Sequence, residues 1–218
     1  MEVSRDFIKE TFSNTIRGSW SKPSEHYGIQ WDFDKVNDTY YVKFRGTGSE
    51  LKSWATNFNF FQKKVKFYEK GELIKVHRGF LKAWSEVKDE IISKLGKNPE
   101  KIIVSGFSQG GALATLAYKD FKYRFPKANI QAFTFASPRV FGIVSAFKLK
   151  KTFSELIRVY VNGDLVTHLP FLLMGFGHVG QRYSLGRKVF DLLPFIPIYW
   201  LIVRTILHHP DVYKKYLK

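Results

Sequence analysis

A serine flanked by glycines is the residue of this sequence best suited to covalent chemistry. The sequence GFSQG occupies residues 106–110, with Ser108 at its centre, after an apolar segment at 101–105 and before a segment that begins GALA at 111. When such a sequence joins a strand to a helix, the serine sits on a strained turn, and the glycines leave room for the chain to cross itself tightly. Ser108 is therefore a candidate nucleophile, with an ordinary structural turn as the alternative.

A serine hydroxyl is a weak nucleophile, so a base must take its proton and an acid must hold that base. In the fold that carries this turn, the chain order of the three residues is Ser, Asp, His. Asp164 follows the apolar segment 157–161 in the context Asn-Gly-Asp, which indicates a loop after a strand, although an aspartate in this context is also typical of a turn. At the start of the helix after Ser108, the backbone N–H of Gln109 has no intrahelical acceptor and could donate to an oxyanion.

These residues need a scaffold, and the pattern of the chain predicts one. Segments rich in β-branched and aromatic residues at 39–45, 101–105, 130–136 and 157–161 are predicted strands. Between them, apolar residues recur at helical spacing over 80–95, and a second helix is predicted over 109–123. Buried strands that alternate with helices indicate an α/β fold with a largely parallel central sheet.

Composition narrows the classes of protein further. The 218 residues contain 35 Lys and Arg against 19 Asp and Glu, a net charge of +16, and no cysteine. The absence of cysteine excludes disulfides and thiolate chemistry, and no metal or cofactor is expected. The positive charge favours polyanions such as anionic lipid or nucleic acid, but no nucleic-acid recognition motif accompanies it, so no nucleic-acid partner is expected.

Length and hydropathy bear on organisation and location. At about 150 residues per domain, we expect one domain over 1–218. The first residues contain no apolar stretch typical of a signal peptide, and the run 192–203 is too short for a transmembrane helix. The location is otherwise open, with a cytoplasmic or peripheral-membrane location favoured. The oligomeric state is also open.

Several further segments, in order along the chain, resemble the class 3 lipases, the fungal triacylglycerol lipase type of the α/β-hydrolase fold. The resemblance spans residues 38–213 and rests on GFSQG together with five segments: FRGT at 44–47, VHRGF at 76–80, FASPRV at 135–140, NGDLVTHLP at 162–170 and GHVG at 177–180. It implies the α/β-hydrolase fold, with a largely parallel central sheet flanked by helices, and a Ser-Asp-His triad in which Asp164 orients the histidine. It also implies that the backbone N–H of Thr47 is the second oxyanion donor beside Gln109.

The base is expected in the adjacent pair His208 and His209. Four other histidines precede the acid or resemble positions that the family does not use as the base. In relatives a tyrosine often follows the base at the fifth position, which fits His208 with Tyr213; a four-residue spacing would fit His209. His208 is preferred, and His209 stays an alternative.

The resemblance also implies a mobile lid over residues 48–61, with aromatic side chains that would cover the serine or line the substrate site: Trp54, Phe58, Phe60 and Phe61. Packing in the core is the alternative for this segment. The apolar runs 171–174 and 192–203 are expected to be buried elements or surfaces that dip into lipid. Six lysines could add peripheral contact with an anionic membrane: Lys63, Lys64, Lys66, Lys148, Lys150 and Lys151.

Together, the residues and the resemblance predict a serine carboxylic ester hydrolase, a lipase or phospholipase that acts on acylglycerol or phospholipid esters through an acyl-enzyme. Two alternatives remain. One is a soluble esterase of the cutinase or feruloyl type, which the same triad would serve. The other is a catalytically silent lipid-binding relative, because a fold alone does not establish activity.

Overall fold

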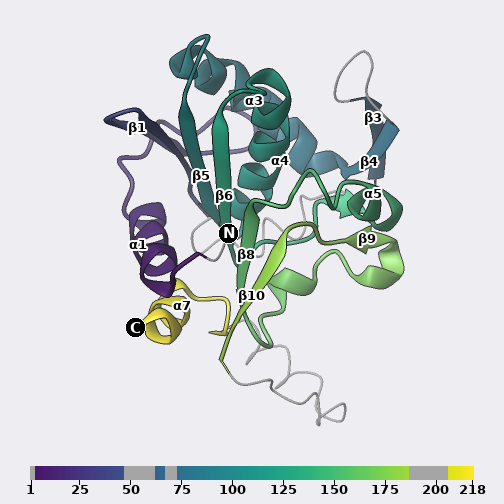
Figure 1. Cartoon of the computed structure of the whole chain (residues 1–218). Coiled ribbons are helices and arrows are strands. Elements are labelled where there is room, and N and C mark those ends of the chain that lie inside the picture. The colour runs from purple at the N-terminus through teal and green to yellow at the C-terminus, as the bar shows by residue number, and fades with distance from the viewer. Residues whose placement is uncertain (1–2, 47–61, 67–72, 187–205) are drawn as a thin grey trace, which may run out of the picture.

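A largely parallel six-stranded sheet forms the centre of the molecule in the computed structural model, which describes residues 3–46, 62–66, 73–186 and 206–218. The strand order is β1-β2-β5-β6-β8-β10 (Figure 1). Only β1 runs antiparallel to its neighbour. The strands are β1 (Trp31–Val36), β2 (Thr39–Phe44), β5 (Lys101–Phe107), β6 (Asn129–Phe135), β8 (Leu156–Val161) and β10 (Gln181–Leu185). The predicted α/β class and the four predicted strands are confirmed.

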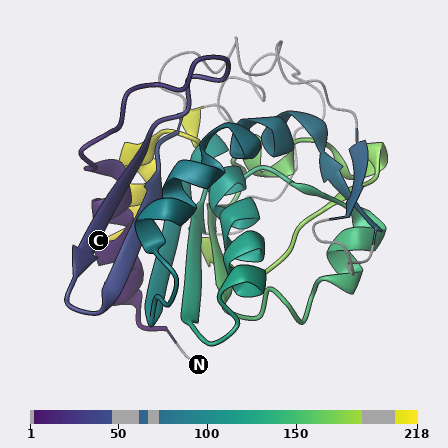
Figure 2. The same ribbon diagram turned by 90° about the horizontal axis from the view of Figure 1, so that it is seen from above.

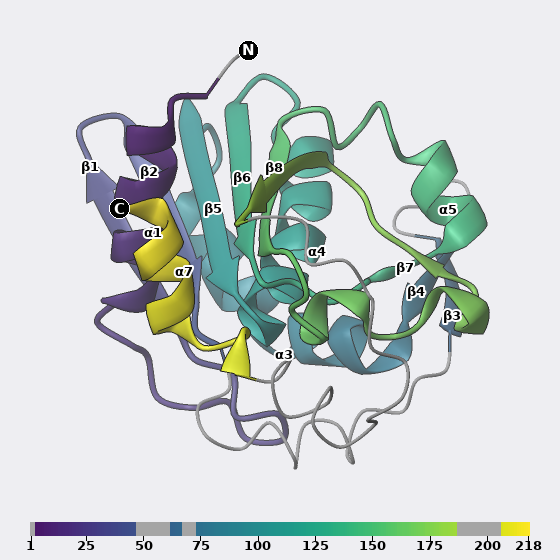
Figure 3. The ribbon, with the colours of Figure 1, turned by 90° about the horizontal axis from the view of Figure 1, so that it is seen from below.

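Helices cover both faces of this sheet. On one face lie α3 (Arg78–Leu95) and α4 (Gln109–Arg124), the two predicted helices; on the other lie α1 (Arg5–Ile16) and α7 (Pro210–Leu217). Figure 2 shows α3 and α4 in front of the sheet, and Figure 3 shows α1 and α7 side by side on the opposite face. The N-terminal and C-terminal ends of the described chain therefore meet on one side of the molecule.

The alternation of side chains along β5 divides the core into two layers. Ile102 and Val104 point into the cluster beneath α3 and α4, whereas Ile103 and Phe107 point into the cluster beneath α1 and α7. Successive residues of a strand face opposite sides of the sheet, so a strand covered on both sides must be apolar throughout. β5 is buried from Ile102 to Phe107, which places the end of this strand, and the serine that follows it, within the core.

A second, smaller sheet lies on the side of the molecule away from α1 and α7 (Figures 1 and 3). Its order is β3-β4-β7-β9, and each adjacent pair of strands is antiparallel. It comprises β3 (Gln62–Lys66), β4 (Leu73–His77), β7 (Phe141–Gly142) and β9 (Phe176–Gly177), with α5 (Ile143–Lys148) and the short 3-10 helices η1 (Val166–His168) and η2 (Leu172–Met174) beside it. None of the helices in the described part of the chain is both long and apolar enough to cross a membrane.

Candidate active site

Ser108 lies on the sharp turn between β5 and α4, as the sequence predicts. Its φ angle is +56°, in the left-handed region that costs energy for a residue with a side chain. A Cβ built on Gly106 would lie 2.1 Å from the carbonyl oxygen of Gly110, and one built on Gly110 would lie 2.3 Å from that of Phe44. Only glycine fits at these two positions, so the local sequence enforces the turn that presents Ser108.

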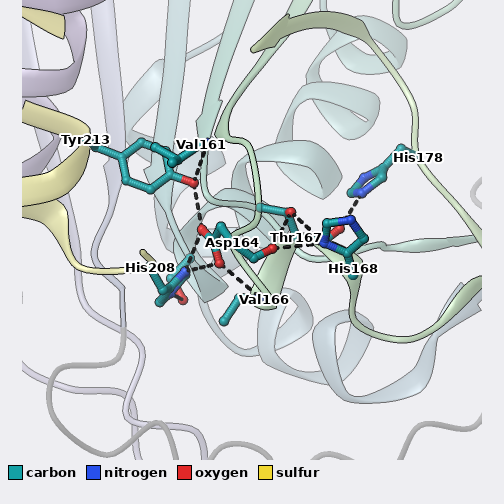
Figure 4. A network of polar contacts seen from close by, with 9 residues as sticks. Val161, Asp164, Val166, Thr167, His168, His178, His208 and Tyr213 are labelled. Atoms are coloured by element: carbon teal, nitrogen blue, oxygen red, sulfur yellow. Dashed lines mark hydrogen bonds and ion pairs between the residues drawn. The ribbon is translucent and has the colours of Figure 1, made fainter. Parts of the chain in front are cut away.

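Three residues from distant parts of the chain meet at this turn. His208 Nε2 lies 2.8 Å from Ser108 Oγ, and His208 Nδ1 lies 3.0 Å from Asp164 Oδ2 and 3.1 Å from Asp164 Oδ1. Asp164 is fully buried, and Ser108 and His208 are nearly so. Figure 4 shows His208 directed at Asp164 from the segment that precedes α7. The geometry forms a continuous hydrogen-bonded chain from carboxylate through imidazole to hydroxyl.

The carboxylate of Asp164 is fixed by two donors besides His208 (Figure 4). The backbone N–H of Val166 donates to Oδ1 at 2.9 Å, and the hydroxyl of Tyr213 donates to Oδ2 at 2.6 Å. The same hydroxyl accepts a hydrogen bond from the backbone N–H of Val161 at 3.1 Å. Complete burial and the adjacent Asp164 raise the pKa of Tyr213 well above its ordinary value, which keeps the phenol protonated as a donor.

Tyr213 is a site residue that the sequence analysis used only as a landmark for the base. Its spacing from His208 was the available signal. His208 lies just before α7 and Tyr213 lies within it. The phenol of Tyr213 therefore contacts Asp164 while the imidazole of His208 faces Ser108. The hydrogen-bonded chain therefore runs from Tyr213 through Asp164 and His208 to Ser108.

His209, the alternative base, occupies a different environment. Its side chain is exposed, and its Nδ1 accepts a hydrogen bond from the backbone N–H of Asp211 at 3.3 Å, which caps the first turn of α7. Of the adjacent pair, the structure brings only His208 to Ser108. His209 contributes to the helix that holds its neighbour in place.

The other histidines near the site brace the loop after Asp164 (Figure 4). His168 Nδ1 lies 2.9 Å from the carbonyl oxygen of Asp164, and His178 Nε2 lies 2.6 Å from that of Thr167. Burial, and next the charge of Arg158, hold the pKa of His178 well below its ordinary value. A neutral imidazole that donates to a carbonyl stabilises the loop, and in this position it does not contact Ser108.

The predicted oxyanion donors are only partly within the described residues. Gln109 is buried at the first position of α4, directly after Ser108. Thr47 lies outside the described residues, but Gly46 before it lies against the serine: a Cβ built on Gly46 would be 3.3 Å from Ser108 Cβ. Gly46, the residue before Thr47, therefore lies beside the nucleophile. The predicted lid residues Trp54, Phe58, Phe60 and Phe61 also lie outside the described residues.

Comparison with known proteins shows the family. Residues 41–174 match the family model for class 3 lipases. The chain is 35% identical over 168 residues to a secreted mono- and diacylglycerol lipase from Fusarium solani, an alignment that covers 72% of this chain and 47% of the relative. It is 31% identical over 153 residues to a lipase from Rhizomucor miehei, covering 66% of this chain and 41% of that protein. The protein belongs to the class 3 lipase family and has the α/β-hydrolase fold.

Solved structures agree with this assignment. One, described as a triacylglycerol lipase whose catalytic centre is a serine protease triad, superposes with a TM-score of 0.67 at 27% identity and covers 78% of this chain and 66% of its own. The chain spans about half the length, or less, of the curated relatives it matches.

The expected cytoplasmic location is wrong, because the Fusarium solani relative is named as a secreted lipase. The expectation rested on the first residues of the sequence. The composition of those residues does not by itself decide the location of the protein.

Proposed function

We propose that this protein is a serine carboxylic ester hydrolase that acts on lipid esters, with Ser108 as nucleophile, His208 as base and Asp164 as the acid that orients it. The observation that carries the proposal is the buried chain of hydrogen bonds from Asp164 through His208 to Ser108 Oγ. Membership of the class 3 lipases supports it.

In the first half of the reaction, Ser108 Oγ attacks the ester carbonyl carbon while its proton passes to His208 Nε2. Asp164 accepts the Nδ1–H hydrogen bond and stabilises the imidazolium that forms. The negative charge on the former carbonyl oxygen is stabilised by the backbone N–H groups of Gln109 and Thr47. As the tetrahedral intermediate collapses, His208 returns the proton to the departing alcohol, and Ser108 keeps the acyl group.

In the second half, a water molecule takes the place of the alcohol. His208 removes a proton from the water as it attacks the acyl carbon, and the same two N–H groups stabilise the second tetrahedral intermediate. Collapse of this intermediate breaks the bond to Ser108 Oγ, which regains its proton from His208. The carboxylic acid leaves, and the enzyme is restored.

The proposed substrates are acylglycerol or phospholipid esters. The Fusarium solani relative is named for mono- and diacylglycerol, and the net charge of +16 favours contact with an anionic lipid surface. The aromatic segment 48–61 is proposed as a lid over the site.

The test compares the native chain with Ser108→Ala on p-nitrophenyl esters of short and long acyl chains, and then on emulsified acylglycerol and phospholipid vesicles. We expect turnover by the native chain and loss of turnover in the variant. A phosphonate ester that traps serine nucleophiles should add its mass to the peptide containing Ser108 and to no other. Native protein that hydrolyses none of these esters, or that is labelled elsewhere, would overturn the proposal.

A further inference from the structure

α5 lies beside the small sheet, on the opposite side of the molecule from α1 and α7 (Figure 1), and exposed apolar side chains gather on α5 and η2. The apolar surface that they form consists of the side chains of Ile143, Val144, Phe147, Leu172, Leu173 and Met174. Leu173 is fully exposed and Phe147 is 80% exposed. We call this surface the η2–α5 face.

The two elements of the η2–α5 face are held together by the backbone. The N–H of Ile143 donates to the carbonyl oxygen of Gly175 at 2.7 Å, and α5 packs on β9, which directly follows η2. Single exposed apolar side chains are common on proteins, but a contiguous cluster marks a binding surface. Most of the strongly exposed large apolar side chains in the described part of the chain belong to this region. The face is therefore a contiguous apolar surface whose two elements are joined through the backbone.

Lysines border the η2–α5 face. A groove of about 830 Å³ runs between the face and the β3–β4 hairpin, and Lys64, Lys75 and Lys148 line it together with Leu173 and Met174. The elements that form this region, β3, β4, α5 and η2, contain no aspartate or glutamate. The apolar surface thus has a cationic border.

Two of these lysines oppose each other directly. Lys64 on β3 pairs with Lys75 on β4 in the antiparallel register, and both side chains are exposed. Like charges at directly opposed positions destabilise a pair of strands, and an anion between them removes that penalty. The cross-strand pair is therefore an independent indication that the partner of this surface is anionic.

We infer that the η2–α5 face docks on an anionic lipid surface, with Phe147 and Leu173 among the acyl chains and Lys64 and Lys75 at the level of the lipid phosphates. Apolar tips bordered by lysines match the two layers of such a surface. The inference rests on the proposed lipase function. η2 begins eight residues after Asp164, so the docking face and the proposed acid belong to neighbouring parts of the chain.

The test is binding to vesicles, measured by sedimentation, with every variant made in the Ser108→Ala chain so that lipid is not consumed. Vesicles of phosphatidylcholine alone are compared with vesicles containing about 30 mol% phosphatidylglycerol. The second composition is chosen to give the vesicle a negative surface potential of roughly −30 mV. We expect Phe147→Asp, and separately Leu173→Asp, to weaken binding to anionic vesicles by at least about tenfold.

The charge contribution needs a control with the same change in net charge. Lys64→Gln with Lys75→Gln should weaken binding by about 25-fold at low salt, since each lysine near the surface is worth about fivefold. The matched control, Lys9→Gln with Lys97→Gln, alters exposed lysines on α1 and after α3 and should change binding by less than about threefold. An equal loss in the control would show that net charge alone attracts the lipid and would overturn the inference.

Two further measurements separate the other outcomes. In chains that retain Ser108, hydrolysis of a soluble short-chain ester should be unchanged by Phe147→Asp, which shows that the variant is folded. If the native chain hydrolyses no ester but still binds vesicles through the η2–α5 face, the proposed function is rejected and the docking surface is retained. Unchanged vesicle binding in Phe147→Asp and Leu173→Asp, or a dimer in sedimentation that Phe147→Asp abolishes, would reject the docking surface and leave the function standing.

Discussion

Replacing Tyr213 by phenylalanine should weaken the fold and the site together. The hydroxyl of Tyr213 donates to Asp164 Oδ2 and accepts from the backbone N–H of Val161, both within the buried core. Phenylalanine keeps the ring and its packing against Phe107 and Phe12. The variant therefore removes two hydrogen bonds and very little apolar contact.

The expected magnitude follows from these two bonds. A hydrogen bond to a charged group contributes about 1.5–3 kcal/mol, and a buried N–H left without its acceptor costs about 1–3 kcal/mol. We expect Tyr213→Phe to lower the free energy of unfolding by about 3 kcal/mol, which for a chain of this length lowers Tm by about 6–12 °C. Asp164 keeps the Val166 donor, so kcat should fall by about 10- to 100-fold with KM for a soluble ester unchanged.

Tyr118→Phe is the matched control. The Tyr118 hydroxyl donates to the carbonyl oxygen of Thr152 at 3.1 Å, and its ring is buried away from the site. This variant should lose about 1 kcal/mol of stability and none of the activity. Thermal unfolding and initial rates on p-nitrophenyl butyrate measure both quantities. If Tyr213→Phe loses stability but keeps the native kcat, the phenol only supports packing and the assigned positioning of Asp164 is refuted.

Three further predictions address the base, the turn and acid stability. His208→Ala should lower kcat by about 10⁴-fold or more, whereas His209→Ala should keep it within about twofold, as steady-state rates would show; the reverse result would transfer the role of base to His209. Gly110→Ala forces a Cβ to within 2.3 Å of the Phe44 carbonyl oxygen and should cost about 3 kcal/mol, against about 1 kcal/mol for Gly96→Ala, where φ is +70° but the space is open; equal losses in urea unfolding would contradict the crowding at the turn. Burial lowers the pKa of His77 to about 4, so the folded state binds fewer protons than the unfolded state and stability should fall as the pH drops from about 6.5 to 4. His77→Asn keeps a side-chain cap for α3 and should remove about 2–3 kcal/mol of that loss between pH 7.5 and 4.5; an unchanged pH dependence of urea unfolding would reject this cause.

The central strands and the two helices on one face could be predicted because the order of apolar residues in each segment indicates which residues are buried. β5 and β6 are buried on both sides and are rich in β-branched and aromatic residues, and α3 carries its buried residues at helical spacing. The helix α1 was not predicted, because two of its four buried residues are Thr11 and Thr15. These threonines interrupt the row of apolar residues that marks the buried face of a helix. The edge strands β1 (WDFDKV) and β10 (QRYSL) carry charged or polar residues at several positions, so neither has the run of β-branched and aromatic residues that marks the central strands.

The small sheet could not be predicted for a different reason. β7 and β9 are two residues each, and they form where Phe141 pairs with Gly177 and with Val76 of β4, both distant from it in the chain. A strand of this length has no pattern of its own. Its formation depends on tertiary contacts that a local reading does not contain.

Within the site, predictability follows the same rule. The turn around Ser108 is enforced by Gly106 and Gly110, its neighbours in sequence, so the GFSQG motif alone was enough to predict it. The choice between His208 and His209 depends on how α7 packs, because adjacent residues before a helix point in different directions: one imidazole reaches Ser108 and the other caps α7. Tyr213 could be associated with the base by spacing, but its bond to Asp164 arises only when α7 lies against the end of β8.

The position of His208 in the chain also has a consequence for the synthesis of the protein. Ser108 and α4 are made before His208, the proposed base, which lies a hundred residues further along the chain. His208 is held by α7, which packs on α1, a helix made much earlier. A nascent chain therefore carries its nucleophile without a base until α7 has emerged and docked. Under the proposed function, ester hydrolysis measures completed folding, and activity during refolding should appear when α7 docks rather than when the sheet forms.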